Sequence, residues 1–300
     1  MITIMLNTGR ISSKEPNLQN ITADEAVRAC FVPEEGNTLI VSDYSAQETR
    51  VLADQAQEKN YIDFFLNGDG DSHSMVASRM FSQIQGKPVK VSKTENVDLR
   101  QIGKVLSFQI AYGASAWSVK DSFGITEAKA QKFIDAYLES FPDLKNYFEK
   151  RKHEVLTNGY VVTDPISKRR IYMQDWSRFT ELKTLIAAHR GSAPRDLMRE
   201  YFMLKGKFER TSLNYPIQSI SASMMKLAGV NMFNWIESQN LLGTVKIVSF
   251  IHDEMCVECP KSMAEDVADA CQRSMESAAA VFVKTMPVPA QPNITDFWQK

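Results

Sequence analysis

The chain has 300 residues, of which 44% are hydrophobic and 24% are charged, and its formal net charge is −1. This composition is that of a globular chain long enough for two lobes, and it excludes a disordered protein. Because acids and bases balance, any nucleic-acid surface must be a local cluster of cations. No apolar run approaches the length of a membrane span and no signal peptide is recognisable, so we expect a cytosolic protein.

The first part of the chain predicts a buried strand followed by helices. The strand covers residues 38–43, and a helix is expected at about 46–57. Further helical segments are expected to continue through Phe65 and to cover 73–81. A turn is expected at 67–71 and a loop at 85–89. Ser92 and Glu95 form a capping-box pattern, which predicts a helix that runs to about Tyr112 and ends at Gly113.

The second part predicts further helices and two strand regions. Helices are expected at about 126–140 and 142–157, and a hairpin at 160–173 turns at Asp164 and Pro165. Residues 174–208 are basic and only weakly periodic, so the sequence leaves them unassigned. A long helix at about 217–238 precedes an apolar strand, and Ser262 with Glu265 predicts the cap of a helix that reaches about Phe282. Clustered strands and long helices indicate an α+β fold.

Two adjacent acids, Asp253 and Glu254, interrupt apolar residues on both sides. One interpretation is a hairpin turn whose acids lie in solvent, and the other is a metal site, which needs a further acid. Asp43 supplies that acid, because it lies at the carboxyl end of the strand at 38–43, where ligands often bind. Asp43 and Asp253 are thus candidates to hold two Mg²⁺ ions about 3.5–4 Å apart, with Glu254 as a weaker ligand or a support for the ligands.

The helix expected at 95–112 carries a row of functional side chains at a spacing of four. Arg100, Lys104, Phe108 and Tyr112 share one face, since each step of four residues drifts by only about 40°. The cations suit a polyphosphate, and the aromatic rings suit a stacked base or sugar. The alternative is a helix with a solvated basic end and a buried aromatic end.

Cys256 and Cys259 form a C-x-x-C pair. Positions i and i+3 of a strand face opposite ways, and no second C-x-x-C is present to complete a zinc site. The sequence therefore disfavours structural zinc.

Five stretches, in this order along almost the whole chain, resemble signatures of family A DNA polymerases of the bacterial polymerase I type. They are TGRISSKEPNLQNI from residue 8, DYSAQE from residue 43, RQIGKVLSFQIAYG from residue 100, NYPIQ from residue 214 and HDE from residue 252. DYSAQE resembles motif A of that family, the stretch from residue 100 resembles motif B, and HDE resembles motif C. Five signatures in the family's order are far more specific than any one of them.

The resemblance implies a right-hand polymerase fold, in which a palm of antiparallel sheet and helices adjoins helical fingers. It places the first part of the palm at residues 1–58, the fingers at 59–208 and the second part of the palm at 209–300. The thumb, the proofreading exonuclease and the start of the palm are expected to be absent from this chain. The resemblance also implies template-directed DNA synthesis, in which deoxynucleotides are added to a primer 3′-OH and pyrophosphate is released.

The resemblance assigns roles to individual residues. The metal ligands would be Asp43, Asp253 and the carbonyl of Tyr44, and the catalytic residues Asp43, Asp253, Glu254 and Lys104. Lys104 would also protonate the leaving pyrophosphate. Nucleotide would be bound by His73, Arg100, Lys104, Phe108, Tyr112, Gln47 and Glu48, the last as a steric gate against a 2′-OH. Primer–template DNA would be contacted by Arg10, Asn17, Gln19, Asn20, Arg210, Asn214, Gln218 and His252.

Two departures from the family pattern are visible. Gln109 stands where many members have glycine, and the segment 174–208 is longer than in the bacterial enzymes, which is typical of phage-type members. For a phage-encoded protein the cytosol would be that of the host.

Several other functions remain open. A single-subunit RNA polymerase shares motifs A, B and C, but Glu48 with Tyr112 argues against it because a 2′-OH needs space. A metal-dependent nuclease would use the same carboxylates without needing the row from Arg100 to Tyr112. Two further interpretations are a non-catalytic DNA-binding remnant, and half of a split polymerase whose partner polypeptide carries thumb and exonuclease. In the split enzyme that partner would cover a palm-sheet edge left open by the first six residues.

Overall fold

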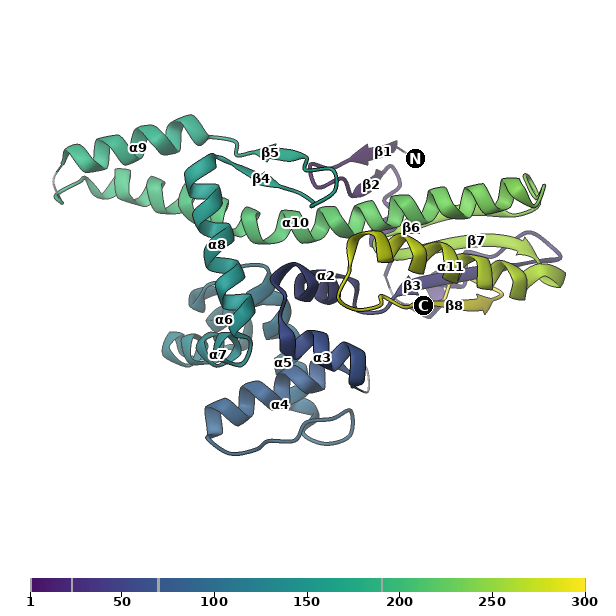
Figure 1. Ribbon diagram of the computed structural model, residues 1–300, viewed down its shortest axis with the longest axis horizontal. Coiled ribbons are helices and arrows are strands. Elements are labelled where there is room, and N and C mark those ends of the chain that lie inside the picture. The colour runs from purple at the N-terminus through teal and green to yellow at the C-terminus, as the bar shows by residue number, and fades with distance from the viewer. Residues whose placement is uncertain (1, 23, 69–70, 190, 300) are drawn as a thin grey trace. The chain divides into compact units, whose positions relative to one another are not determined.

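The computed structural model describes residues 2–22, 24–68, 71–189 and 191–299 (Figure 1). Residues 69 and 70 of the expected turn, and residue 190 of the unassigned segment, lie outside the described residues. The chain divides into two compact units, one formed by Met1–Asp54 with Ile217–Lys300 and the other by Gln55–Pro216. Strands and helices both contribute, so the α+β prediction is confirmed.

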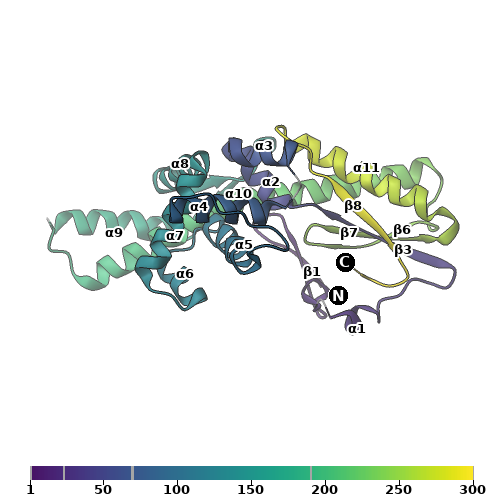
Figure 2. The same ribbon diagram turned by 90° about the horizontal axis from the view of Figure 1, so that it is seen from below.

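A four-stranded antiparallel sheet forms the centre of the first unit, in the order β6-β7-β3-β8. Its strands are β3 (Asn37–Tyr44), β6 (Lys246–Ile251), β7 (Glu254–Pro260) and β8 (Ala290–Thr295). The apolar run of β3 is buried, as its sequence predicts. Helix α11 (Ala264–Phe282) packs on the sheet (Figure 2), and the Tyr44 hydroxyl donates a hydrogen bond to the Met275 carbonyl at 2.6 Å.

The first residues of the chain form a separate small sheet. Strand β1 (Ile2–Met5) pairs antiparallel with β2 (Ile11–Lys14), and these two strands are not part of the four-stranded sheet. The expectation that this segment forms an edge of the main sheet is therefore wrong, because the chain turns back at Gly9, where φ is 85°, and satisfies one side of β1 with β2. The 3₁₀ helix η1 (Leu18–Asn20) and the helices α1 (Glu25–Arg28) and α2 (Gln47–Ala56) follow.

The second unit is mainly helical. It contains α3 (Lys59–Asn67), α4 (Ser72–Gln85), α5 (Val97–Ala111), α6 (Ala116–Phe123), α7 (Glu127–Ser140) and α8 (Pro142–Asn158). Thr126 caps α7 by accepting from the Lys129 N–H, and Gly159 ends α8 at φ 72°. The predicted hairpin forms from β4 (Tyr160–Val162) and β5 (Arg170–Tyr172), and the Asp164 carboxylate accepts from the N–H groups of Ile166 and Ser167.

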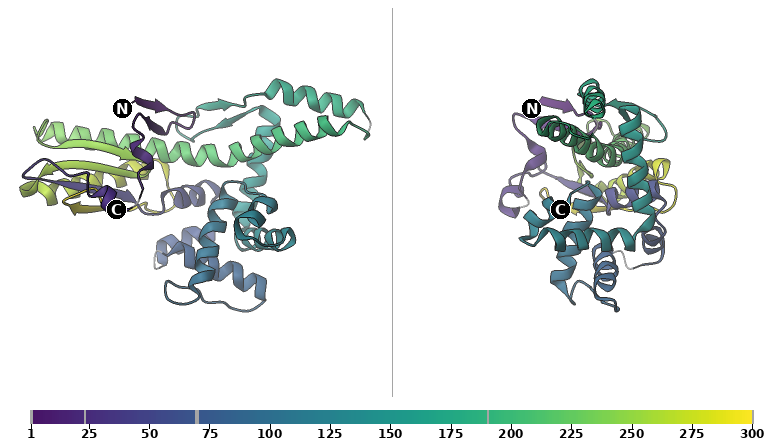
Figure 3. Two further views of the ribbon diagram at one scale, coloured as in Figure 1. Left: turned by 180° about the vertical axis from the view of Figure 1, so that it is seen from behind. Right: turned by 90° about the vertical axis from the view of Figure 1, so that its left-hand side faces the viewer.

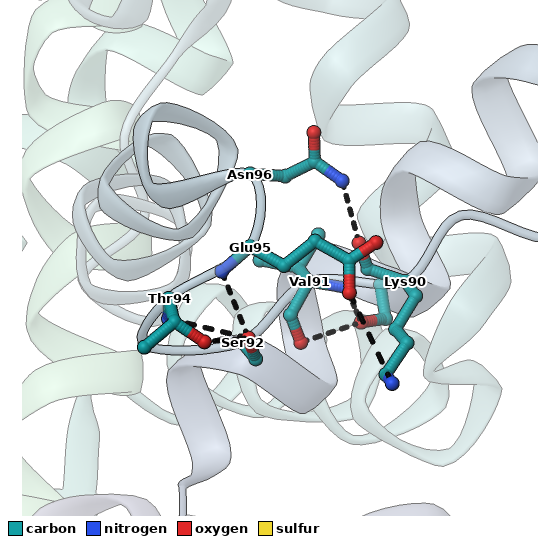
Figure 4. A network of polar contacts seen from close by, with 7 residues as sticks. Lys90, Val91, Ser92, Thr94, Glu95 and Asn96 are labelled. Atoms are coloured by element: carbon teal, nitrogen blue, oxygen red, sulfur yellow. Dashed lines mark hydrogen bonds and ion pairs between the residues drawn. The ribbon is translucent and has the colours of Figure 1, made fainter.

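The expected capping box does not start α5. Figure 4 shows that Ser92 Oγ accepts from the N–H groups of Thr94 and Glu95, so one half of the pattern forms. The Glu95 carboxylate instead pairs with Lys90 at 3.9 Å. Asn96 then adopts a left-handed conformation at φ 54°, and the helix begins only at Val97. The pattern therefore closes a turn rather than a helix.

The predicted cap of α11 is also wrong. Residues 261–263 form the short 3₁₀ helix η2 (Lys261–Met263), which places Met263 at the N-cap without a side-chain hydrogen bond. The predicted end of α11 at Phe282 is confirmed.

The segment that the sequence left unassigned is helical. Helix α9 (Trp176–Ala188) is followed by α10 (Arg195–Ser238), whose 44 residues include the helix expected at 217–238 and contain Pro216. Figure 3 shows α9 beside the first part of α10. A buried cluster joins them, made of Val155, Val161, Met173, Phe179, Leu182, Leu204 and Phe208. Among the described residues, no helix has the length and hydrophobicity needed to cross a bilayer.

Candidate functional site

Asp43 and Asp253 are neighbours at the end of the four-stranded sheet. Strands β3 and β7 pair in a register that places Asp43 opposite Glu254, and the Tyr44 N–H donates to the Asp253 carbonyl at 3.2 Å. His252 and Asp253 form the two-residue turn between β6 and β7, with His252 at φ 56°. Both aspartates are partly exposed. The turn interpretation is thus correct for Asp253, and the turn also brings this residue beside Asp43.

Glu254 belongs to β7 rather than to the turn, and its side chain is almost fully buried. Its exposed fraction is 2%, and Oε1 accepts a hydrogen bond from Trp298 Nε1 at 2.6 Å. Arg28 lies over the Trp298 ring, 4.4 Å from its centroid. The hydrogen bond offsets the cost of burying the carboxylate. Trp298, which the sequence did not single out, therefore holds Glu254 in place.

A cavity of about 310 Å³ adjoins Asp43. It is lined by Val41, Asp43, Tyr44, Ser45, Gln291, Pro292, Asn293 and Gln299. No group of three or more His, Cys, Asp or Glu side chains placed to hold a metal occurs within the described part of the chain. The available donors are therefore two carboxylates and the backbone oxygens beside them, which are hard oxygen ligands of the kind that Mg²⁺ prefers.

The cysteines of the C-x-x-C pair are buried on β7 and free. Burial, together with the nearby Glu254 and Glu258 carboxylates, raises the pKa of Cys256 to about 12. Burial likewise raises the pKa of Cys259 to about 11. Both thiols are therefore protonated at neutral pH.

Glu48 lies in the first turn of α2 and forms an ion pair with Arg10, which follows the turn after β1. Both side chains are partly buried, at 21% and 29% exposure, so the pair is less screened than a surface pair. The neighbouring Gln47 is buried and donates to the Ser221 carbonyl at 3.4 Å. The carboxylate of Glu48 is thus held in a defined position.

Three of the predicted DNA contacts line one apolar cavity of about 520 Å³ in the first unit. Arg10, Gln19 and His252 contribute polar groups to it together with Lys226, and Gln19 Nε2 donates to the Phe250 carbonyl at 3.4 Å. The other predicted DNA contacts of this unit lie elsewhere. Asn17 caps η1 by accepting from the Gln19 N–H, Asn20 is exposed, and Gln218 is partly buried on α10.

The predicted row on α5 is present in the second unit. Arg100, Lys104 and Phe108 lie within α5, and Tyr112 ends it. Lys104 is exposed and Phe108 is 39% exposed, so the aromatic end is not simply buried. Gly103, on another face of α5, allows close approach to α4, since a Cβ there would lie 2.8 Å from the Ala77 Cβ. The helix that carries the row therefore packs closely against α4 at Gly103.

Asp71, which the sequence assigned only to a turn, pairs with Arg100. Arg100 Nε and Nη2 donate to the two carboxylate oxygens at 3.0 and 2.9 Å, and Asp71 also caps α4 through Ser74. Burial alone raises the pKa of Asp71, but hydrogen bonds from Arg100 and Ser74 outweigh it and hold the pKa well below its usual range. An acid two residues before His73, at a helix start, was the signal in the sequence.

His73 lies near the aromatic end of the same row. Its ring centroid is 5.9 Å from that of Phe108. Burial lowers the pKa of His73, and the positive charges of Lys104 and Arg100 lower it further. The imidazole is therefore neutral at pH 7, and an anion bound nearby would favour its protonation.

The end of α5 packs on α10 within the second unit. Asn214 Nδ2 donates to the Tyr112 carbonyl at 3.4 Å, and a Cβ on Gly113 would lie 3.2 Å from the Arg210 Cγ. Gln109, the departure from the family pattern, donates to Ser122 Oγ of α6 at 2.7 Å. The structure thus brings Tyr112, Arg210 and Asn214 together.

Comparisons with known proteins agree with this arrangement. The family model "DNA polymerase family A" matches residues 1–300. The thermostable DNA polymerase I of Thermus aquaticus is 33% identical over 297 residues, covering 97% of this chain and 31% of that protein. DNA polymerase I of Bacillus subtilis is 33% identical over 285 residues, covering 93% and 28%.

A solved structure is also similar. It is the POL domain of Pol1 from M. smegmatis in complex with DNA primer-template and dNTP, with a TM-score of 0.78 and 28% identity. The match covers 97% of this chain and 46% of that one. The chain therefore spans about 30% of the length of the curated relatives and under half of the solved domain.

Proposed function

The chain belongs to DNA polymerase family A, and from this membership we propose that it carries the nucleotidyl-transfer residues of a DNA-directed DNA polymerase. The reaction adds a deoxynucleotide to a primer 3′-OH opposite a template base and releases pyrophosphate. The observation that supports the proposal best is the pairing of β3 with the β6–β7 turn, which brings Asp43 beside Asp253. Each lies in a stretch that resembles a catalytic motif of the family.

Asp43, Asp253 and the Tyr44 carbonyl would hold Mg²⁺. These donors fit the ion, because Mg²⁺ is usually bound through one or two carboxylates and completes its coordination with water and substrate phosphates. When bound, two such ions would neutralise charge on the attacking and leaving oxygens. The backbone hydrogen bond from Tyr44 to Asp253 fixes the spacing of the two strand ends. Glu254, held by Trp298, keeps the end of β7 in place rather than acting as a ligand.

The residues on α5 bind the nucleotide in this proposal. Arg100 and Lys104 contact the triphosphate through charge-assisted hydrogen bonds, and Lys104 supplies a proton to the pyrophosphate. Phe108 and Tyr112 contact the base, and His73 adds a contact to phosphate. Glu48, fixed by Arg10, excludes a ribose 2′-OH and so selects deoxynucleotides. Gln47 supports that position from within α2.

DNA is the second partner. Arg10, Gln19 and His252 share one cavity, and Arg210 and Asn214 share the surface at the end of α5, so both groups are suited to the primer–template. Asn17, Asn20 and Gln218 complete the proposed set. A second polypeptide that carries a thumb is a further proposed partner.

Primer extension tests the proposal. The chain is incubated with a labelled primer–template, deoxynucleotides and Mg²⁺, and Asp43→Asn and Asp253→Asn are compared with Asp266→Asn, a matched change on the exposed side of α11. We expect the first two variants to lose extension by several orders of magnitude while binding DNA normally, and the control to remain active. Near-normal extension by Asp43→Asn or Asp253→Asn would refute the metal assignment.

If the wild-type chain binds primer–template without extending it, two alternatives are favoured: half of a split polymerase, or a non-catalytic DNA-binding protein. Adding a polypeptide that covers the remaining length of the relatives separates them. Restored extension identifies half of a split polymerase, and continued inactivity identifies a non-catalytic DNA-binding protein.

A further inference from the structure

The second unit carries a helical arm, formed by α9 and residues 195–210 of α10. The arm is held together by its apolar side. Phe179 of α9 stacks on Tyr201 of α10 with centroids 5.2 Å apart, and Leu204 and Phe208 belong to the buried cluster behind them. Arg178 of α9 also pairs with Glu200 at 2.6 Å. Figures 1 and 3 both show α9 alongside this part of α10. The arm therefore presents one fixed face of α10 to solvent.

A narrow arc of that solvent face carries arginines and no acid, and the exposed Asp196 flanks it. At about 100° per residue, five positions of α10 fall within an arc of about 80° opposite the buried side. They are Arg195, Arg199, Phe202, Gly206 and Arg210, which we call the arm stripe. The nearby acids, Asp196, Glu200 and Glu209, lie outside this arc. Glu200 and Glu209 are engaged by Arg178 and Lys205.

The cations of the arm stripe are available for a partner. Arg195, Arg199 and Arg210 are exposed, and no ion pair to any of the three occurs among the described residues. The Arg210 guanidinium lies back along the stripe, since its Nη1 is 3.1 Å from where a Gly206 Cβ would be. Three arginines on a chain with a net charge of −1 form a local cationic track, which is the footprint of a phosphate backbone.

The spacing and the apolar residues narrow the choice of nucleic acid. Arg195 and Arg210 are separated by a rise of about 22 Å along α10, which is long enough to contact several phosphates of one strand. Phe202 is 56% exposed between the arginines, and its neighbour Met203 is 62% exposed. An exposed aromatic ring among cations is suited to stacking on unpaired bases, whose faces a duplex does not offer.

We propose that the arm stripe binds the unpaired part of the template strand, with the arginines on phosphates and Phe202 against a base. This inference rests on the proposed function for the identity of the strand. It extends the predicted DNA surface from Arg210 along α10 into the segment 195–208. That segment received no role from the sequence.

The test is a binding measurement without Mg²⁺ or nucleotide, so that it does not depend on catalysis. Fluorescence anisotropy compares a labelled blunt duplex with the same duplex carrying a template overhang of about 16 thymidines, the upper end of known site sizes. The wild-type chain is expected to bind the overhang DNA about tenfold more tightly than the blunt DNA. The double variant Arg195→Glu with Arg199→Glu is expected to lose this gain and keep its affinity for the blunt duplex.

Three further measurements sharpen the test. Phe202→Ala is expected to reduce the gain by about fivefold, through lost stacking. The milder pair Arg195→Gln with Arg199→Gln should lower the salt dependence of overhang binding by about 1.4 ions, which corresponds to two phosphate contacts on a single strand. The control, Lys132→Glu with Lys145→Glu, changes the net charge equally at exposed positions on α7 and α8. Circular dichroism melting verifies that each variant is folded.

The outcomes are distinct. Full retention of the overhang gain in the folded stripe variants overturns the proposal. An equal loss in the control also overturns it, because net charge alone then explains binding. If the stripe variants lose the tighter binding of overhang DNA, the proposed role of the arm stripe is supported even when the wild-type chain extends no primer. Failure of the proposed function is therefore recognised separately.

Discussion

Arg100 and Asp71 form a two-point ion pair, in which guanidinium nitrogens lie 3.0 and 2.9 Å from the two carboxylate oxygens. Both side chains are largely shielded from solvent, at 23% and 10% exposure. The pair joins the start of α4 to the proposed triphosphate contact on α5. It therefore fixes the direction of the guanidinium before any nucleotide arrives.

Removing the charge of Asp71 should impair nucleotide use. In Asp71→Asn the guanidinium loses one of its two fixed acceptors, so we expect the KM for deoxynucleotides to rise about tenfold, equal to about 1.4 kcal/mol, with a smaller change in kcat. Steady-state single-nucleotide incorporation measures both constants. The matched control is Asp98→Asn, an exposed acid in the first turn of α5. An unchanged KM in Asp71→Asn would show that Asp71 does not position Arg100.

The difference in unfolding free energy between wild type and Asp71→Asn should depend on pH. The folded-state pKa of Asp71 is lowered, so the ion pair stabilises the fold fully above the unfolded pKa of about 3.9 and loses this effect as pH falls through the folded value. The stability difference between wild type and Asp71→Asn should thus be constant near neutral pH and shrink below about pH 4. Urea unfolding at several pH values measures it.

Nucleotide binding should protonate His73. In the free chain, burial and the charges of Lys104 and Arg100 hold its pKa below the usual 6.5. A bound triphosphate adds negative charge, so the pKa should rise and nucleotide affinity should increase as pH falls towards 6. Proton NMR titration with and without a deoxynucleotide measures the shift, with His73→Gln to assign the signal. Identical titration curves would place the phosphates away from His73, and the other three histidines serve as internal controls.

Glu48→Ala should relax sugar selection. The substitution removes the carboxylate that Arg10 holds in place, and the vacated space admits a 2′-OH. We expect ribonucleotide incorporation to rise by about tenfold or more relative to deoxynucleotide incorporation. Glu48→Gln is the control, because it keeps the volume and removes only the charge. Equal discrimination by wild type and Glu48→Ala would remove the steric-gate role.

Trp298→Phe should destabilise the first unit without changing the Mg²⁺ requirement. The variant loses the Nε1 donor and leaves the buried Glu254 oxygen without that hydrogen bond, at a cost of about 1–3 kcal/mol. Chemical denaturation measures the loss, and Trp235→Phe provides a matched ring change on α10. A raised Mg²⁺ requirement in Trp298→Phe would instead make Glu254 a ligand.

The sequence predicted most elements because their signals are local. The apolar run of β3 and the hairpin turn at Asp164 each depend on a few adjacent residues. The cap at Ser92 was predicted wrongly because Asn96 turns to a left-handed conformation before the helix starts. The segment 174–208 gave weak periodicity because its apolar residues are divided between two helices that pack on each other and on α8.

The candidate site was predictable where a residue follows a recognisable strand or helix. Asp43 and Asp253 both end apolar strands, and the row from Arg100 to Tyr112 repeats at helical spacing. Asp71 and Trp298 were missed because their partners lie 29 and 44 residues away. A local pattern indicates at most the helix cap at Asp71, not its contact with Arg100. Which strands pair, and in which register, had to come from the structure.

The length of the two-residue turn at His252 and Asp253 limits which sequence changes this hairpin tolerates. Asp253 reaches the Tyr44 N–H only because two residues separate Ile251 from Glu254. One residue more or fewer would move the aspartate away from Asp43 and turn the following side chains to the opposite face of β7. Substitutions that leave Asp253 in place keep this register, whereas a change in the length of the turn shifts Asp253 relative to Asp43.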